Sequence, residues 1–541
     1  MDATHLLTLV TFLPLGVGVA LLATAAVARA LGSEGLPEGV WKIAGLATTL
    51  VTFAFSLRLW TGFDPTEIGF QFVEYAPWLP DYGIHYFVGI DGISLVLVLL
   101  TTFLMPIALA ASWFDIGRSV RGYVFFMLFL ETGMLGAFVS LNVFAFYVFW
   151  ELMLVPMYFI IGIWGGPRRV YAAVKFFLFT MVGSLLMLVA ILVVYYLHFQ
   201  QTGVLSLDLV APPGGGTTGL IGTTIPTAGV WWQTQFWLFA AFALAFAIKV
   251  PMVPLHTWLP DAHVEAPTPG SVVLAAVLLK MGTYGFLRFA LPLFPAAAIE
   301  WTPAILALSV IGIVYGSLVA MVQADIKKLV AYSSVAHLGF VMLGMFALNV
   351  QGVSGSVLQM INHGLSTGAL FLLVGMLYER RHTRMIDQFG GVARPMPVYA
   401  AFFGVVTMSS IGLPLLNGFV GEFLILLGTF LAWPWMAVVA TSGVVLAAAY
   451  MLWMYRRVFF GPVEHEENRS LIDLDLREKL VMVAIVVPIF WIGLYPEALL
   501  RRIEPTVIEL IERVEQGSRA ARAAESELAL ALPGQRVEHR P

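Results

Sequence analysis

Long apolar runs recur along the chain, separated by short polar connections. A helix needs about 20 mostly apolar residues to cross the hydrocarbon core of a bilayer. The pattern predicts fourteen such spans, over residues 6–28, 40–59, 90–113, 122–141, 143–164, 171–198, 233–264, 270–291, 301–322, 328–349, 355–378, 398–431, 434–460 and 478–496. We therefore expect an all-α, multi-pass membrane protein.

Two of the predicted spans are longer than the rest and are interrupted inside. The seventh contains three prolines between positions 251 and 260, and the twelfth contains Gly412, Pro414 and Gly418. Proline removes a backbone donor and clashes with the preceding turn, so both should be broken helices. Each is the fourth member of a group of five, spans 4–8 and spans 9–13. An odd number of spans inverts the second group, which is the inverted-repeat pattern of secondary transporters.

This pattern divides the chain into four parts. We expect spans 1–3 with a loop on the outer face in residues 1–121, and the first five-helix repeat in residues 122–291. The second, inverted repeat should occupy residues 301–460, and the last span with a surface tail residues 478–541. The tail from 501 onward mixes Arg and Glu in a helical pattern, which predicts a surface helix with a frayed end.

The distribution of basic residues predicts the orientation in the membrane. Lys and Arg collect in cytoplasmic loops. The odd-numbered connections hold nearly all the basic residues between spans, whereas the even-numbered ones hold only Arg58 and Arg288. Both termini should therefore lie outside. The first apolar run has no basic segment before it and no small-residue cleavage site after it, so we expect a retained span.

Composition supports a membrane location and excludes several functions. The chain is 60% hydrophobic and 11% charged, against about 25% charged in soluble domains. Its net charge is -4 and it has no long basic stretch, so no nucleic-acid partner is expected. It has no cysteine, which excludes disulfides, thiolate-bound iron–sulfur clusters and covalent haem. No nucleotide-binding glycine motif is present.

Five ionisable residues lie at similar depth within apolar spans. Glu131 has nine residues of its span on each side, which places it about 13 Å deep. The others are Glu151, Lys249, Lys280 and Glu422, with Lys249 at the first helix break and Glu422 just after the second. One interpretation is purely structural, because paired charges can hold two helices together. Because a charge at the centre of a spanning helix costs about 2.5–3.5 kcal/mol, the set more strongly indicates proton or cation transfer.

Histidines and one further lysine extend this set. His337 lies about nine residues into the tenth span, and His363 about nine residues into the eleventh. They could relay protons, or they could be core residues whose ring nitrogens are hydrogen-bonded. Lys175 lies near the start of the sixth span and could instead extend to the membrane surface. His256 and His263 lie near two carboxylates, but their spacing does not bring ligands to one face, so no metal site is expected.

Several segments resemble one known family. They are GIDGISLVLVLLTTFL from Gly89, FWELMLVPMYFIIGIWGG from Phe149, the long KVPMVPLHTWLPDAHVEAPTPGSVVLAAVLLKMGTYGFLRF from Lys249, DIKKLVAYSSVAHLGF from Asp325, INHGLSTGALFLLVGMLYERRHTR from Ile361 and GFVGEF from Gly418. They are similar to the antiporter-like subunit M (chain 4 in mitochondria) of proton-pumping NADH:quinone oxidoreductase, respiratory complex I. The resemblance extends from the third to the thirteenth span.

The resemblance implies roles for individual residues. Glu151 and Lys249 match the carboxylate–lysine pair of one half-channel, and Lys280 matches the family's central lysine. His337 and His363 look like the polar link between the halves. Glu422 matches the glutamate on the second broken helix, where sister subunits typically have lysine. Glu131 and Lys175 remain supporting candidates.

The resemblance also implies a setting. We expect a bacterial inner-membrane subunit that conducts protons while NAD, FMN, iron–sulfur clusters and quinone act on other subunits, with no cofactor on this chain. Its partners would be the lipid bilayer and the other membrane subunits, especially the neighbouring antiporter-like ones. The alternatives are a subunit of a multi-subunit Na+/H+ antiporter or of a membrane-bound hydrogenase, and a purely structural membrane spacer.

Overall fold

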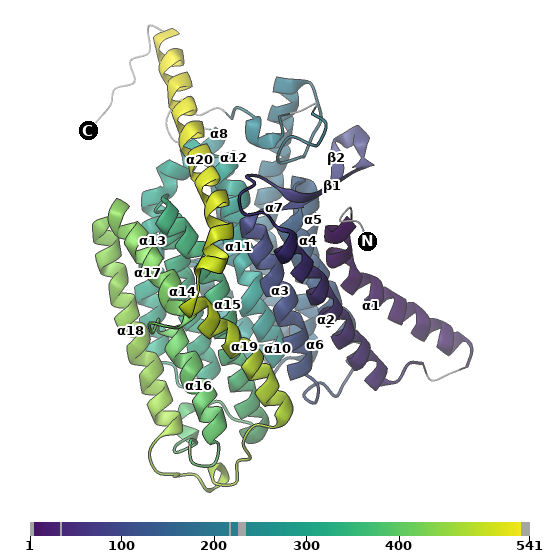
Figure 1. The fold of residues 1–541 in the computed structure, drawn as a ribbon, viewed down its shortest axis with the longest axis vertical. Coiled ribbons are helices and arrows are strands. Elements are labelled where there is room, and N and C mark those ends of the chain that lie inside the picture. The colour runs from purple at the N-terminus through teal and green to yellow at the C-terminus, as the bar shows by residue number, and fades with distance from the viewer. Residues whose placement is uncertain (1–4, 33–34, 216–217, 226–233, 532–541) are drawn as a thin grey trace.

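A computed structural model describes residues 5–32, 35–215, 218–225 and 234–531, in which long helices form a bundle (Figure 1). The first half contains α1 (Leu6–Ala30), α2 (Glu38–Gly62), α3 (Gly92–Ala111), α4 (Val120–Val139), α5 (Val143–Leu152), α6 (Leu154–Trp164), α7 (Arg169–Thr202), α8 (Thr234–Lys249), α9 (Trp258–Glu265), α10 (Thr268–Val273), α11 (Leu279–Gly285) and α12 (Leu291–Leu293). The second half contains α13 (Pro295–Met321), α14 (Ile326–Met345), α15 (Val350–Arg381), α16 (Pro397–Ser410), α17 (Asn417–Ala432), α18 (Pro434–Phe459), α19 (Leu476–Leu494) and α20 (Glu497–Ala531).

Helices occupy every predicted span, but not every one is long enough to cross a membrane alone. Among the described residues, 11 helical segments are long and apolar enough, or up to 12 if α19 and the start of α20, bent by 68°, count as one span. Three shorter apolar helices, α8, α16 and α17, account for most of the difference from the predicted number. The structure is thus a mostly helical membrane protein.

The shorter helices lie where the sequence predicts broken spans. The chain leaves the α-helical conformation between α8 and α9, over 250–257, and between α16 and α17, over 411–416. At the second break Gly412 has φ +74°, a left-handed conformation that glycine adopts without steric cost. A Cβ at this position would come within 2.9 Å of the Glu422 Oε2 atom, so glycine also leaves space for that carboxylate.

The centre of the bundle consists of two buried helical segments. The most apolar windows of Thr268–Leu293 and of α15 are 100% buried, whereas those of α1, α2 and α18 are 33% buried and leave apolar side chains on the surface. Within Thr268–Leu293 the backbone forms π-helical turns at Leu274–Leu278 and Phe286–Ala290, on either side of α11. Such turns inside helices are frequent at functional sites. Lys280 lies between them.

The all-α prediction is wrong in one place. The segment predicted as an outer-face loop contains an antiparallel hairpin, β1 (Gln71–Leu79) and β2 (Ile84–Ile90). It was missed because a search for runs of 20 apolar residues does not detect strands of nine and seven residues. Gly83, with φ +64°, forms the turn.

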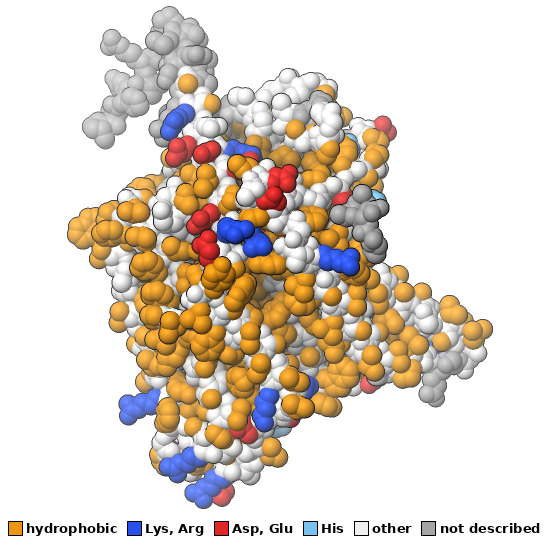
Figure 2. Space-filling model, viewed as in Figure 1, with side chains coloured by type: hydrophobic (Ala, Val, Ile, Leu, Met, Phe, Trp, Pro, Cys, Tyr) orange, Lys and Arg blue, Asp and Glu red, His pale blue; other side chains and the backbone are white. Residues whose placement is uncertain are grey.

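The hairpin marks one end of the molecule, upper in Figure 1, which we call the hairpin end. The opposite end carries the connections 112–119, 165–168, 322–325, 382–396 and 460–475, and Figure 2 shows basic side chains gathered there; we call it the basic end. A broad apolar belt lies between the two ends (Figure 2).

The tail predicted as a surface helix contains α20. It packs against α3, α13 and α15, then projects past the hairpin end (Figure 1). The predicted frayed end falls in residues 532–541, which lie outside the described part of the chain.

Candidate functional site

Two of the predicted residues meet at the centre of the bundle. Lys280 on α11 and His363 on α15 are separated by 83 residues in sequence, and the Lys280 Nζ lies 2.6 Å from the His363 Nδ1. The same Nζ donates a 2.6 Å hydrogen bond to the Ala275 carbonyl oxygen, inside the first π-helical turn. Both side chains are buried. Because the imidazole Nδ1 must accept when Lys280 donates, one proton is shared between the two residues.

The line of polar groups continues from His363 into the second broken helix. The rings of His363 and His337 are 5.8 Å apart between centroids. The His337 Nδ1 lies 3.0 Å from the Glu422 Oε1, and its Nε2 lies 3.3 Å from the Ser410 hydroxyl. Lys280, His363, His337 and Glu422 therefore form one buried series of two hydrogen-bonded pairs, Lys280 with His363 and His337 with Glu422, with a gap between the two histidines.

Amides and hydroxyls that the sequence analysis missed surround this gap. Gln359 donates to the Glu422 Oε1 at 3.2 Å, and Asn362 donates to the Asn417 carbonyl oxygen at 2.7 Å. A cavity of about 10 Å³ lies among the histidines and these polar side chains, close to the minimum that holds one water. Gln359, Asn362 and Ser366 recur at i, i+3 and i+7 along the helix that carries His363, and this spacing is the sequence signal that could have identified them.

The predicted pair of the first half lies at the first break but is not in contact. Lys249 is the last residue of α8, and its Nζ lies 4.1 Å from the centroid of the Trp150 ring. Neither the Lys249 Nζ nor the buried Glu151 Oε1 has a hydrogen-bond partner in the described part of the chain, and the two residues form no ion pair within 4.0 Å there.

Glu131 and Lys175 have contrasting surroundings. Glu131 on α4 is fully buried, and neither carboxyl oxygen has a partner among the described residues. The Lys175 Nζ on α7 instead lies 2.7 Å from the Asp261 Oδ2 and donates to the Thr257 carbonyl oxygen at 2.9 Å. Lys175 thus ties α7 to the second half of the first broken helix.

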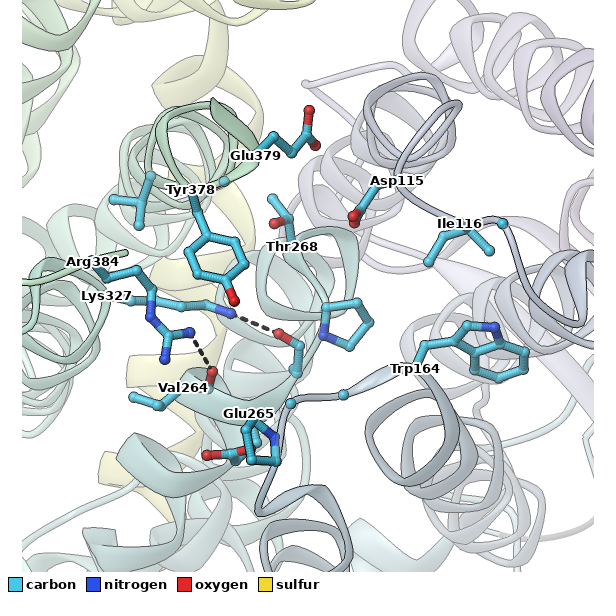
Figure 3. A pocket seen from close by; sticks show the side chains of 18 of the residues that line it. Asp115, Ile116, Trp164, Val264, Glu265, Thr268, Lys327, Tyr378, Glu379 and Arg384 are labelled. Atoms are coloured by element: carbon cyan, nitrogen blue, oxygen red, sulfur yellow. Dashed lines mark hydrogen bonds between the residues drawn. The ribbon is translucent and has the colours of Figure 1, made fainter. Parts of the chain in front are cut away.

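A cavity of about 330 Å³ opens at the basic end (Figure 3). Its charged lining comprises Asp115, Arg118, Glu265, Lys327, Glu379 and Arg384. The Lys327 Nζ donates to the Ala266 carbonyl oxygen at 2.6 Å, and Arg384 donates to the Val264 carbonyl oxygen at 2.9 Å. Burial raises the pKa of the Asp115 carboxyl, and Lys327 opposes this effect.

The position of Lys327 corrects the sequence analysis. The prediction placed Lys327 in a connection, before a span at 328–349, but it is buried in the first turn of α14. Asp325 caps that helix by accepting from the Lys327 and Lys328 backbone amides. The signal available in the sequence was this N-cap aspartate, which predicts a helix beginning before residue 328.

A second buried cluster lies between the centre of the bundle and the hairpin end. Arg288, in the second π-helical turn, forms a 2.5 Å ion pair with Asp91, the N-cap residue of α3. The Tyr284 hydroxyl accepts from the Arg288 Nε at 3.1 Å and donates to the Phe138 carbonyl oxygen at 2.9 Å. The prediction had placed Arg288 in an even-numbered connection, but it is a buried, paired residue.

These features define a multi-pass membrane protein of the antiporter-like class, with ionisable groups connected across its interior. Across the described ranges, no group of three His, Asp or Glu residues is arranged to hold a metal ion.

Comparisons with known proteins give the same class. Residues 140–447 match the family model described as NADH:quinone oxidoreductase/Mrp antiporter, TM. The chain is 49% identical over 511 residues to NADH-quinone oxidoreductase subunit M of Rhodobacter capsulatus, covering 94% of this chain and 96% of the relative. It therefore belongs to the NADH:quinone oxidoreductase/Mrp antiporter family, in the group of subunit M.

Solved structures share the fold. A chain of respiratory complex I from Thermus thermophilus superposes with a TM-score of 0.82 at 31% identity, covering 94% of this chain and 99% of that one. A chain of the Mrp complex from Dietzia has a TM-score of 0.78 at 19% identity, with coverages of 95% and 100%, and shows a likeness of fold alone.

Proposed function

We propose that this chain is a proton-conducting membrane subunit of an NADH:quinone oxidoreductase, driven by redox chemistry on other subunits. The observation that carries the proposal is the buried series from Lys280 through His363 and His337 to Glu422. A membrane spacer without transport would not need ionisable groups in line at the most deeply buried helices, where each unpaired charge is costly.

The route is proposed to begin at the basic end. Basic connections favour the cytoplasm, so both termini and the hairpin would lie outside. Protons would enter the cavity between Asp115 and Lys327 and reach Lys280 and Lys249, with Glu131 and Lys175 in supporting positions. They would then pass His363 and His337 and leave by way of Glu422. The ion pair of Arg288 with Asp91 supports lateral passage, because it opposes a direct exit from Lys280 to the hairpin end.

The separation of Glu151 from Lys249 suggests how the first half is switched. In the state described, the Lys249 Nζ lies 4.1 Å from the centroid of the Trp150 ring, and no carboxylate of the described residues lies within 4.0 Å of it. Movement of Glu151 toward Lys249 would stabilise its protonated form, and withdrawal would favour release of the proton. We propose that neighbouring antiporter-like subunits in a bacterial inner membrane transmit this change by electrostatic coupling.

A reconstitution experiment tests the proposed function. The native assembly is purified, placed in proteoliposomes and supplied with NADH and quinone, while proton uptake and NADH oxidation are recorded together. His363→Gln should abolish most proton uptake, whereas His382→Gln, an exposed histidine at the end of α15, should leave it unchanged. Normal uptake in the His363 variant would refute the route.

The same preparation separates the rival assignments. An Na+/H+ antiporter would exchange protons for Na+ without NADH and would purify without NADH oxidation. A redox-driven subunit would purify with that activity and would translocate protons in Na+-free buffer. We expect the second result, because the identity to subunit M extends over 94% of the chain.

A further inference from the structure

An apolar groove crosses one lateral face of the protein within the membrane belt. Its volume is about 220 Å³, and it lies between α2 and α3 on one side and α19 with the start of α20 on the other. On α3 its lining extends from Val96 to Phe103, a length of about 10 Å along the helix. Figure 2 shows a hollow in the apolar surface, with basic and acidic side chains above it.

Arg502 contacts the lining of the groove, and two further arginines adjoin it or a lining residue in the sequence. Trp60 lines the groove, and the Arg502 guanidinium lies 3.7 Å from the centroid of its ring. Arg58 follows Leu57, which also lines the groove, and Arg501 adjoins Arg502 at the start of α20. Each lies within about two turns of a helix end, Arg58 near the end of α2 and the other two near the start of α20.

These arginines have positive charge available for an anion. None forms an ion pair within 4.0 Å of a carboxylate in the described part of the chain. The Arg502 Nε is buried and lacks a hydrogen-bond partner there, although its Nη1 donates to the Ala498 carbonyl oxygen. Arg501 acts electrostatically on Asp64, and Glu497 is one turn away, but neither carboxylate forms an ion pair with Arg501 among the described residues.

We propose that this groove binds an anionic phospholipid, with one acyl chain between α2, α3 and α19 and the phosphate at Arg58, Arg501 and Arg502. Basic pockets between spanning helices are suited to anionic headgroups. The tryptophans Trp60 and Trp491, whose rings lie 6.4 Å apart, suit the boundary between acyl chain and headgroup. A zwitterionic lipid would leave the arginine charge uncompensated.

The floor of the groove gives the lipid a role in the proposed function. Ile361 and Leu365 of α15 line it, and His363 lies between them on the opposite side of that helix. Gly364 lets α15 approach α3 so closely that a Cβ there would be 2.9 Å from the Leu100 Cδ2. If His363 relays protons, as proposed above, an acyl chain behind α15 keeps water away from the lipid-facing side of the relay.

Photolabelling of the whole assembly tests the site. The purified complex is incubated with phosphatidylglycerol carrying a diazirine on its acyl chain, irradiated and digested, and the labelled peptides are identified by mass spectrometry. We expect labels in 96–103 and 361–365, which excess phosphatidylglycerol reduces at least fivefold and phosphatidylcholine does not. Leu99→Trp, which fills the groove, should remove them, whereas Val445→Trp on exposed α18 should not.

Charge variants test the headgroup contact separately. Arg58→Gln, Arg501→Gln and Arg502→Gln combined should abolish the preference for phosphatidylglycerol, and Arg456→Gln with Arg457→Gln at the basic end should preserve it. Equal competition by both lipids in the unaltered protein, or competition by quinone alone, would overturn the proposal. So would a cross-link from Leu99→Cys to a neighbouring subunit, because this chain has no native cysteine that could form the same link. None of these measurements depends on proton pumping.

Discussion

The Lys280 Nζ lies 2.6 Å from the His363 Nδ1, across the interface of the two most deeply buried segments of the protein. At this separation the two nitrogens cannot both hold a proton directed at the other, so the pair titrates as a unit. Loss of a proton from Lys280 therefore changes the state of His363 at once. This coupling is the physical basis for the first prediction.

Removing the Lys280 charge should stop transfer at the centre of the series. We expect Lys280→Met to lower the ratio of protons pumped to NADH oxidised by about tenfold or more, the lower range of effects for a lost proton-transfer group. Lys328→Met, in the first turn of α14, is the matched control and should have little effect. Dye-monitored proton uptake in proteoliposomes gives the ratio. Unchanged pumping by the Lys280 variant would exclude it from the route.

Glu422 should be required at the other end of the series. Its Oε1 accepts from Gln359 and lies 3.0 Å from the His337 Nδ1. Glu422→Gln keeps the size and an acceptor but cannot hold a negative charge, so protons should accumulate on the histidines and pumping should fall about tenfold or more. Glu464→Gln, on an exposed connection, should pump normally. If Glu422→Gln pumped protons as well as Glu464→Gln, Glu422 would have only a packing role.

The ion pair of Lys175 with Asp261 should hold α7 against the second half of the first broken helix. Both side chains are partly exposed, 20% and 31%, so the coupling should be modest, about 0.5–1 kcal/mol. Lys175→Met and Asp261→Asn should each lower the temperature of half-inactivation of the assembly. The exchanged pair Lys175→Asp with Asp261→Lys should recover part of the loss. No recovery would show that the two residues act independently.

The cavity at the basic end should make proton uptake sensitive to pH. Because burial raises the pKa of Asp115, its carboxyl holds a proton to higher pH than a solvent-exposed aspartate. Asp115→Asn removes this proton-binding group, so the alkaline limb of the pumping profile should move to lower pH while the acid limb stays in place. Proton uptake measured across a pH series checks this. Identical profiles would argue against uptake through this cavity.

The sequence predicted helices and helix breaks better than it predicted contacts. The breaks follow from local chemistry, because the prolines around 251–260 and the pair Gly412 and Pro414 act on the backbone wherever they occur. The meeting of Lys280 with His363 does not, since residues 83 positions apart leave no local pattern. Lys327 was predicted to lie outside the tenth span because the apolar run begins after it, although it is a buried residue of α14. The hairpin was missed because its strands are shorter than a membrane span. The pairing of Lys175 with Asp261 was missed because the two residues are 86 positions apart.

Gly412 offers a test that separates backbone strain from an effect on Glu422. Gly412 and Gly461 both have positive φ, +74° and +90°, so alanine at either position should cost about 1–2 kcal/mol of conformational strain. At Gly461 a Cβ meets no atom within 4 Å, whereas at Gly412 it would lie 2.9 Å from the Glu422 Oε2. Both variants should therefore lower thermal stability to a similar extent. Only Gly412→Ala should also reduce the proton-to-NADH ratio, because it displaces the carboxylate from His337. Equal pumping by the two variants would show that the position of Glu422 tolerates this shift.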